Sequence, residues 1–178
     1  MSSNLIYDNL AQDLFFEVSH GPYKVDNNIL LSPHSIQENT DGGAYLHNII
    51  SGHINRLDDG RYTPYHLGHS TEVKGIRTIT EGDHRFFNNI FIGGYNEKLK
   101  YGMVVFDVSK RPIYAGDNLF LNGALPMTDR EQGWVEKSVN PNLKVEETPE
   151  GEVYLASDIN LQELSSFKGK KIGTETLG

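Results

Sequence analysis

A short apolar segment that follows an asparagine recurs along the first half of the chain, and this recurrence limits the possible folds most. The segments are "NLIYDN" at 4–9, "NNILLS" at 27–32, "HNIISG" at 47–52 and "NNIFIGG" at 88–94. The asparagines directly before the apolar residues are Asn4, Asn28, Asn48 and Asn89, separated by steps of 24, 20 and 41 residues. The last step is about two steps of 20. A period in the twenties, with each unit a short strand closed by Asn and Gly turns, is typical of a solenoid.

Residue types within the repeats favour an all-β solenoid. The strands are rich in Ile, Val, Phe and Tyr, and the dense leucine pattern of leucine-rich repeats is absent. We therefore predict a parallel β-helix over residues 1–94. Asparagine tolerates the left-handed conformation that sharp turns need, and stacked asparagine amides can bond to one another. A β-sandwich with turn asparagines every 8 to 12 residues is the alternative.

The second half of the chain has less regular spacing. Strands are expected at 101–108, 118–123 and 152–157. Residues 125–152 are interpreted as a long loop excursion that carries the single Trp, followed by one further solenoid strand, and 160–167 as a short helix. Because no linker rich in Pro, Gly or Ser divides the chain, residues 1–178 are interpreted as one domain.

Composition excludes several classes of protein. The net charge of −8 and the lack of a basic stripe argue against a nucleic-acid or membrane partner. The short basic run at 168–171 is interpreted as solvated surface. Without cysteine there is no disulfide or thiolate chemistry. No membrane span and no signal peptide are visible, so a cytoplasmic location is expected, although the compartment is otherwise unknown.

The stretch "DLFFEVSHGP" places a carboxylate inside an apolar strand. Successive side chains of a strand point to opposite faces, so Phe16 and Val18 would fill the core. Phe15, Glu17 and Ser19 would then face outward. An ordinary surface Glu is the simplest interpretation of Glu17. The outward neighbours are not the Lys and Glu mixture of a plain surface, however, which favours a functional carboxylate.

A second stretch, "GGAYLHN", adds aromatic and imidazole groups. By the same alternation Ala44 and Leu46 are expected to point inward, and Tyr45 and His47 outward. An outward patch of Phe, Tyr, His and Glu suits a sugar, because aromatic faces stack on pyranose C–H surfaces and carboxylates bind hydroxyl groups.

Polar side chains are densest between residues 56 and 89. They include Arg61, Tyr65, His66, His69, Glu72, Asp83, His84 and Arg85. The spacing fits neither HExxH nor a facial triad, so neither a metal nor a cofactor is expected. We expect a long loop across one mouth of a cleft, with its charges paired to each other. Phosphate-binding loops and GxSxG motifs are absent.

The motifs together resemble a known family. "QDLFFEVSHGPYKVDNNILLSP", "GGAYLHNIISG", "RYTPYHLGHSTEV" and "GDHRFFNNIF", within residues 4–125, are similar to the later coils of glycoside hydrolase family 120, the β-xylosidases. The resemblance implies a right-handed parallel β-helix and an exo-glycosidase that releases xylose with retention. It assigns the acid/base to Glu17 and places the nucleophilic Asp about one coil upstream, before Met1.

The sequence also departs from that family. It lacks the family's earlier coils and inserted sandwich, so it is interpreted as the C-terminal part of a larger enzyme or as a divergent short relative. Alone, it is expected to bind pentoses weakly, to hydrolyse aryl xylosides barely, and to self-associate through an uncapped N-terminal coil. The expected partner is a xylo-oligosaccharide.

Strand spacing offers a second carboxylate. Retaining glycosidases need carboxyl groups roughly 5 to 5.5 Å apart, and neighbouring strands lie about 4.7 to 4.9 Å apart. Asp41 follows Glu17 by about one coil, although its distance from its marker asparagine indicates that it is out of register. Glu72 is the alternative catalytic carboxylate. Side chains that could contact sugar hydroxyls are His20, Tyr45, His47, His66 and His69.

Two other functions remain open. One is a carbohydrate-binding or structural β-helix without catalysis, which the missing nucleophile favours. The other is a pectinase-like or lyase-like β-helix, which needs clustered Asp for Ca²⁺ or a Lys or Arg base. "LDDGR" supplies too little for that chemistry.

Overall fold

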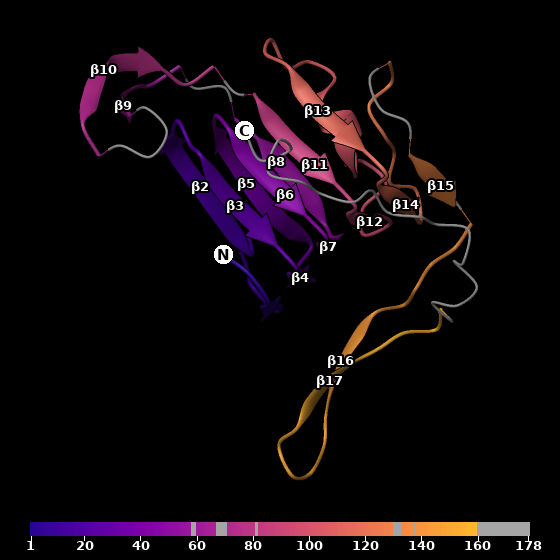
Figure 1. Cartoon of the computed structure of the whole chain (residues 1–178). Helices are drawn as coiled ribbons and strands as arrows, with labels where there is room; N and C mark the ends of the chain where they lie inside the picture. Colours follow the sequence, from indigo (N-terminus) through magenta and orange to yellow (C-terminus); the bar gives the residue numbers. More distant parts are fainter. Residues whose placement is uncertain (58–59, 67–70, 81, 130–132, 137, 160–178) are drawn as a thin grey trace.

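The computed structural model describes residues 1–57, 60–66, 71–80, 82–129, 133–136 and 138–159, and within them the chain is almost entirely β (Figure 1). The exception in these ranges is a short 3-10 helix, η1 (Met103–Phe106). Three sheets are formed only by parallel pairing. Within the described ranges no helix has the length and apolar character to cross a membrane.

The three parallel sheets take strands in rotation. Sheet I holds β1 (Leu5–Ile6), β4 (Ile29–Leu30), β7 (Ile49–Ser51), β12 (Ile90–Ile92), β14 (Leu119–Leu121) and β15 (Trp134–Glu136). Sheet II holds β2 (Leu14–Ser19), β5 (His34–Thr40) and β8 (His53–Arg56). Sheet III holds β3 (Tyr23–Asp26), β6 (Gly43–Leu46), β11 (His84–Phe87) and β13 (Ile113–Gly116). We call one passage through the sheets a coil. Pairing of each coil with the next is consistent with a β-helix, and confirms the predicted all-β class with mostly parallel strands.

The asparagine ladder predicted from the repeat is confirmed. The side-chain Nδ2 of each asparagine donates to Oδ1 of the next, from Asn4 to Asn28 at 2.8 Å, from Asn28 to Asn48 at 3.1 Å and from Asn48 to Asn89 at 2.9 Å. The ladder continues to Asn118 at 3.0 Å. Each Oδ1 also accepts a backbone N–H, so the buried amides at this corner stay hydrogen-bonded.

The left-handed conformation lies one residue earlier than predicted. It is adopted by Ser3, Asn27, His47, Asn88 and Asp117, each directly before a ladder asparagine. The ladder asparagine lies directly before the next strand, and its side-chain amide forms the ladder. The sharp turn therefore falls on the preceding residue, which is Asn or Asp in three of these five coils.

The prediction of two coils between Asn48 and Asn89 is wrong. One coil spans these 41 residues, because an antiparallel hairpin of β9 (Tyr62–His66) and β10 (Val73–Thr78) is inserted between β8 and β11. The inserted strands pair with each other and join none of the three parallel sheets. The segment that was predicted to be a long loop across a cleft therefore forms this hairpin and then strand β11.

The interior is filled by rows of side chains from equivalent positions in successive coils. In sheet I the row is Leu30, Ile50, Phe91 and Phe120, with the last two rings stacked at 5.2 Å between centroids. In sheet III, Val25, Tyr45 and Phe86 form the row. These side chains are at most 1% exposed, so the core is a column along the coils.

The predicted strand at 101–108 is wrong, because η1 occupies that position. Met103 and Phe106 are three residues apart and both are fully buried, a spacing that a helical turn brings to one face. The strand expected within 118–123 is confirmed as β14, so the parallel pairing extends well beyond residue 94.

The predicted excursion over residues 125–152 contains ordered strands. Strand β15 adds to sheet I, and β16 (Lys144–Glu147) pairs antiparallel with β17 (Val153–Ala156) in a hairpin that projects from the body (Figure 1). The strand expected at 152–157 thus exists, but it belongs to this hairpin and is not a further solenoid strand. The helix expected at 160–167 lies outside the described residues.

The first coil forms one edge of sheets I and II, and in sheet III the residues Met1–Ser3 bond to the end of β3 at Asp26. Strands β1, β2 and β3 each stand at the end of their sheet's order. Edge strands carry backbone groups that can pair with another chain. Self-association through this coil stays a prediction.

Candidate functional site

Glu17 lies on the outward face of β2, as the alternation predicts. Leu14 is buried, Phe16 packs against the core, and Phe15, Glu17 and Ser19 are exposed. The Glu17 side chain is 44% exposed, and its Oε1 lies 2.5 Å from a guanidinium nitrogen of Arg61. The Phe15 ring, two residues earlier on the same face, is also exposed. A carboxylate and an aromatic ring are therefore displayed side by side on a rigid sheet.

The backbone next to Glu17 is irregular. Val18 has a φ of 54°, a left-handed conformation that is a genuine outlier for a β-branched residue. The pairing of β2 with β5 shifts register between Glu17 and Ser19. In the inserted hairpin, the Thr63 hydroxyl donates to the Val18 carbonyl at 3.5 Å. Backbone strain of this kind concentrates at functional sites, which supports a role for this end of β2.

A hollow of about 300 Å³ lies on the outer side of sheet II. It is lined by Leu10, Ala11, Gln12, His34, Ile36, Gln37 and Asn55. Gln37 is the neighbour of Phe15 in the next coil, and Asn55 lies one coil further. The Asn55 amide donates to Oε1 of Gln37 at 2.6 Å, while the buried Nε2 of Gln37 has no hydrogen-bond partner among the described residues. The amides of Gln37 and Asn55 therefore lie next to the exposed Phe15 ring, on the same face of sheet II as Glu17.

Asp41 is not opposite Glu17. The position opposite Glu17 in the next coil is Asn39, which agrees with the out-of-register expectation. The Asp41 side chain is 2% exposed. Its Oδ2 accepts from Arg111 at 2.9 Å and lies 3.1 Å from His20 Nδ1. The structure thus places Asp41 at a buried corner, turned toward a guanidinium and an imidazole.

His20 lies at the centre of this corner, and its side chain is 2% exposed. Its Nδ1 is near both Asp41 Oδ2 and, at 3.2 Å, Nε of Arg77, while Nε2 is 3.2 Å from the Arg77 carbonyl. Because Nδ1 donates to Asp41 only when protonated and accepts from Arg77 only when not, one bond excludes the other. Tyr65 packs edge-on at 6.1 Å and carries the Arg77 guanidinium over its ring at 4.8 Å. The inserted hairpin is therefore docked on His20.

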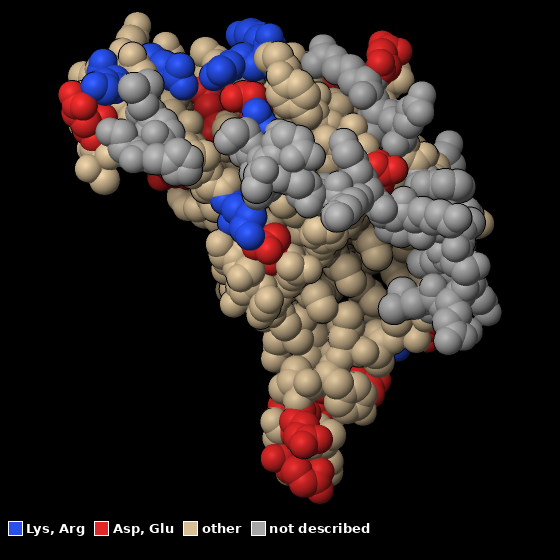
Figure 2. All heavy atoms as spheres, viewed as in Figure 1, with Lys and Arg blue, Asp and Glu red and all other residues tan. Residues whose placement is uncertain are grey.

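Basic side chains gather over the end of the molecule where β9 and β10 lie, whereas acidic ones cover the β16–β17 hairpin (Figure 2). Some charges pair locally, as expected for this stretch. Lys74 binds Glu72 at 2.7 Å and Arg85 binds Asp83 at 3.3 Å. The Glu72 side chain is 70% exposed, and Glu72 lies just before β10. Within the parts described, no group of three or more His, Asp or Glu is placed to hold a metal ion.

The remaining predicted contact residues are scattered. Tyr45 points into the core, where its ring stacks on Phe86 at 4.5 Å, so the outward orientation predicted for it is wrong. His47 is exposed as expected, but it lies at the turn after β6, at the opposite end of that strand from Asp41. His66 is exposed at the end of β9. His69 lies outside the described residues.

A buried carboxylate that the sequence analysis did not single out lies inside the coils. Glu38 is fully buried on β5 and receives hydrogen bonds from three hydroxyl groups. They come from Thr40 at 2.5 Å, from Tyr23 at 3.0 and 3.1 Å, and from Tyr45. The hydroxyls compensate the cost of burying this polar group. The alternation of side chains along the strand could have indicated this burial, because Glu38 points to the same side of β5 as the buried Ile36.

His84 completes this interior cluster. Its Nδ1 accepts the Gly43 backbone N–H at 3.0 Å, so the proton of the neutral ring is on Nε2, which lies 3.8 Å from Glu38 Oε1. Burial raises the pKa of Glu38 to about 7, although the three hydroxyl hydrogen bonds lower it. Burial lowers the pKa of His84 to about 4. The pKa values of Tyr23 and Tyr45 are raised by burial and, secondly, by the Glu38 charge.

These two pKa shifts predict opposite pH dependences of the free energy of unfolding. The raised pKa of Glu38 gives stability that is complete below pH 4.5 and lost as the pH rises through about 7. The lowered pKa of His84 gives stability that is complete above pH 6.5 and lost as the pH falls through about 4. Each shift corresponds to about 3 kcal/mol. In the unaltered chain the two slopes therefore largely cancel between these limits.

Two single substitutions separate these two pH dependences of the free energy of unfolding. Glu38→Gln should leave a chain whose stability rises with pH between 4 and 6.5, and His84→Gln one whose stability falls between 4.5 and 7. Urea unfolding monitored by circular dichroism across this range measures both. If both variants keep the pH profile of the unaltered chain, Glu38 and His84 do not titrate as this cluster requires.

Comparison with known proteins gives one clear relation. No family model matches the chain, and no curated protein matches it. The fold is similar to that of a solved structure of XylC in complex with xylose, with a TM-score of 0.85 and 36% sequence identity. The similarity covers 98% of this chain and 31% of the XylC chain. Nearly all of this chain therefore shares its fold with a part of a larger protein whose structure contains xylose.

Proposed function

We propose that this chain is the catalytic β-helix portion of a retaining exo-β-xylosidase of the family 120 type, which releases xylose from xylo-oligosaccharides. The observation that carries the proposal is the likeness of nearly the whole chain to XylC, whose structure contains xylose. We further infer that the three parallel sheets form a right-handed β-helix. The proposed substrate is uncharged, in keeping with a site that combines amides, an aromatic ring and a carboxylate.

In this proposal Glu17 is the general acid/base. It first protonates the glycosidic oxygen and then activates water against a glycosyl-enzyme intermediate. Its exposure supports this role, as does its place beside the Phe15 ring. Arg61 contacts Oε1 and so fixes the direction of the carboxyl group at the end of β2. Gln37 and Asn55, in the hollow on the same face, are suited to binding sugar hydroxyls.

The nucleophile is proposed to lie outside this chain. Asn39 occupies the position opposite Glu17, and Asp41 is buried against Arg111 and His20. We propose that the nucleophilic Asp lies about one coil before Glu17, as the resemblance to family 120 implies. His20 and Asp41 then serve to hold the corner at which β2 and β5 end.

A non-catalytic carbohydrate-binding β-helix is the second candidate. The observation that favours it is the amide of Asn39 in the position where a second carboxylate would suit a retaining enzyme. Such a protein would bind xylose or xylo-oligosaccharides on the same face without cleaving them.

The stereochemistry of the first product tests the proposal. The natural full-length protein is incubated with xylobiose, and anomeric protons are followed by NMR before mutarotation equilibrates them. Retention predicts that β-xylose forms first. Initial α-xylose would indicate inversion and would exclude a double displacement. Binding of xylobiose without release of xylose would select the non-catalytic alternative.

A further inference from the structure

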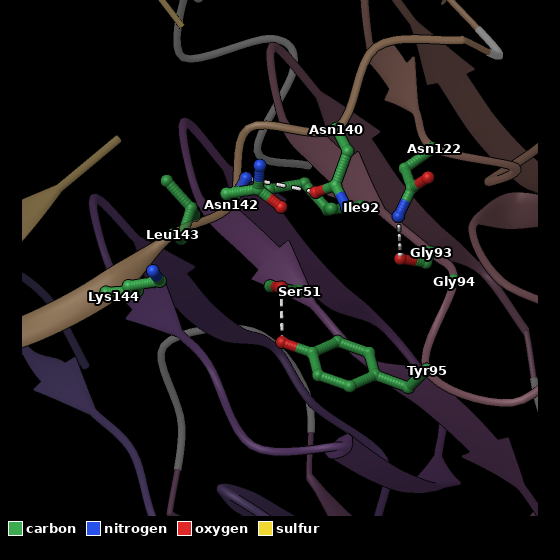
Figure 3. A pocket seen from close by; sticks show the side chains of 10 residues that line it. All are labelled: Ser51, Ile92, Gly93, Gly94, Tyr95, Asn122, Asn140, Asn142, Leu143 and Lys144. Atoms are coloured by element: carbon green, nitrogen blue, oxygen red, sulfur yellow. Dashed lines mark hydrogen bonds between the residues drawn. The ribbon is translucent and has the colours of Figure 1, made fainter. Parts of the chain in front are cut away.

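A second hollow, of about 260 Å³, lies at the end of sheet I, apart from the Glu17 face (Figure 3). Its walls come from the end of β7, the loop after β12, the loop after β14 and the segment that leads into β16. The lining residues are Ser51, Ile92, Gly93, Gly94, Tyr95, Asn122, Asn140, Asn142, Leu143 and Lys144. None of them lines the hollow beside Phe15 and Glu17.

The outer wall is held in place by apolar packing. Val139 and Leu143 pack on the outward face of sheet I, which is formed by Ile92, Leu119 and Leu121. The Asn140 side chain accepts the Asn142 backbone N–H at 3.0 Å, which closes the turn at this wall. The segment is therefore fixed on the sheet, and the hollow is part of the fold.

Tyr95 forms a fixed floor. Its hydroxyl lies 3.0 Å from Ser51 Oγ and donates to the Leu31 carbonyl at 3.3 Å, so the ring is pinned although the residue is half-exposed. In Figure 3 the Tyr95 hydroxyl points toward Ser51, and Asn122 and Asn140 lie across the hollow from the ring. Gly94 leaves room for the Asn122 amide at this wall, because a Cβ there would lie 2.2 Å from Asn122 Nδ2.

The lining has the chemistry of a sugar site. Three asparagine amides and the hydroxyls of Ser51 and Tyr95 can donate to and accept from ligand hydroxyls, and the aromatic ring offers an apolar face for C–H groups. Of the ten lining residues Lys144 is the single charged one, and it is a cation. The volume lies just below the range of about 300–1,000 Å³ that suits drug-sized ligands, which fits one sugar ring.

We propose that this hollow binds a single pyranose unit, separately from the Glu17 face, and prefers a sugar that carries a carboxylate. Tyr95 supplies the stacking surface, the asparagine amides bind ring hydroxyls, and Lys144 pairs with the carboxylate. The proposal shares its ligand class with the proposed hydrolytic function but does not depend on hydrolysis.

Backbone amide shifts in a ¹H–¹⁵N NMR titration of the full chain test this proposal, with D-xylose and D-glucuronate as separate probes. Both should shift the amides of Gly93, Gly94, Tyr95 and Lys144, and glucuronate should bind more tightly. Tyr95→Ala should weaken both sugars by about tenfold, because it removes the ring. Lys144→Met should reduce glucuronate binding to the level of xylose.

Two matched variants keep the outcome decisive. Tyr95→Phe retains the ring and should bind both sugars, so a folding defect in Tyr95→Ala would not hide the result. Tyr154→Ala removes an equally exposed tyrosine on β17 and should change nothing. Glu17→Gln should leave these shifts intact, which separates this site from the proposed catalytic one. Shifts confined to the Phe15 and Glu17 face, or no saturable shift with either sugar, would overturn the proposal.

Discussion

Asn48→Ala is expected to lower the free energy of unfolding by roughly 3–5 kcal/mol, because it removes a buried rung of the ladder. The Asn48 side chain donates to Asn89 Oδ1 and to the Val25 carbonyl, both at 2.9 Å. Its Oδ1 accepts from both the backbone N–H and the side-chain amide of Asn28. Alanine would leave buried groups in two neighbouring coils without their partner, and each such group costs about 1–3 kcal/mol.

Urea unfolding followed by circular dichroism measures this loss. Asn9→Ala is the matched control, since the Asn9 side chain is exposed and its amide bonds to Asp13 at the surface. That variant should lose less than about 1 kcal/mol. Equal losses in the two variants would mean that the ladder contributes no more than an ordinary surface asparagine.

The repeat could be predicted from sequence because each coil marks itself with an asparagine. The same marker could not show that the interval between Asn48 and Asn89 is a single coil. The inserted hairpin of β9 and β10 has strand-like sequence of nearly one coil's length, and only its antiparallel pairing distinguishes it. The 3-10 helix η1 was missed for a related reason, since "MVVF" fits a strand as well as a buried turn.

The outward placement of Glu17 was predictable, but the inward placement of Tyr45 was not. In the second half of β2 apolar and polar side chains alternate, from Phe16 to Ser19, so the faces can be assigned from the sequence. In β6 all four residues are buried, and "GAYL" gives no polar residue that marks the outer face. Its direction follows from the pairing of Tyr45 with Val25 and Phe86, which belongs to the neighbouring coils.

The buried corner depends on contacts that no local pattern contains. Arg111 meets Asp41 across 70 residues of sequence, and Arg77 meets His20 across 57. Each arginine by itself has the appearance of a surface residue. In the interior cluster the hydroxyls come from nearer in the sequence, since Thr40, Tyr45 and Tyr23 lie 2, 7 and 15 residues from Glu38. The long-range member is His84, which bonds to Gly43 across 41 residues.

Glu17→Gln in the natural full-length protein tests whether this outward carboxylate is the acid/base of a xylosidase. On xylobiose, whose leaving group needs a proton, the rate should fall by about 10²–10⁴. On p-nitrophenyl β-xyloside, whose leaving group departs without protonation, the first step should be far less affected. Glutamine keeps the shape of the side chain, so its uncharged amide tests proton transfer and not packing.

The decisive measurement is the ratio of these two rates, with the release of p-nitrophenol recorded in the first turnover. Glu147→Gln, an exposed residue of β16, serves as the matched control and should match the unaltered protein on both substrates. The acid/base role of Glu17 predicts a large loss on xylobiose and a small one on the aryl xyloside for Glu17→Gln alone. Unchanged activity of Glu17→Gln on both substrates, or the selective loss in Glu72→Gln instead, would contradict it.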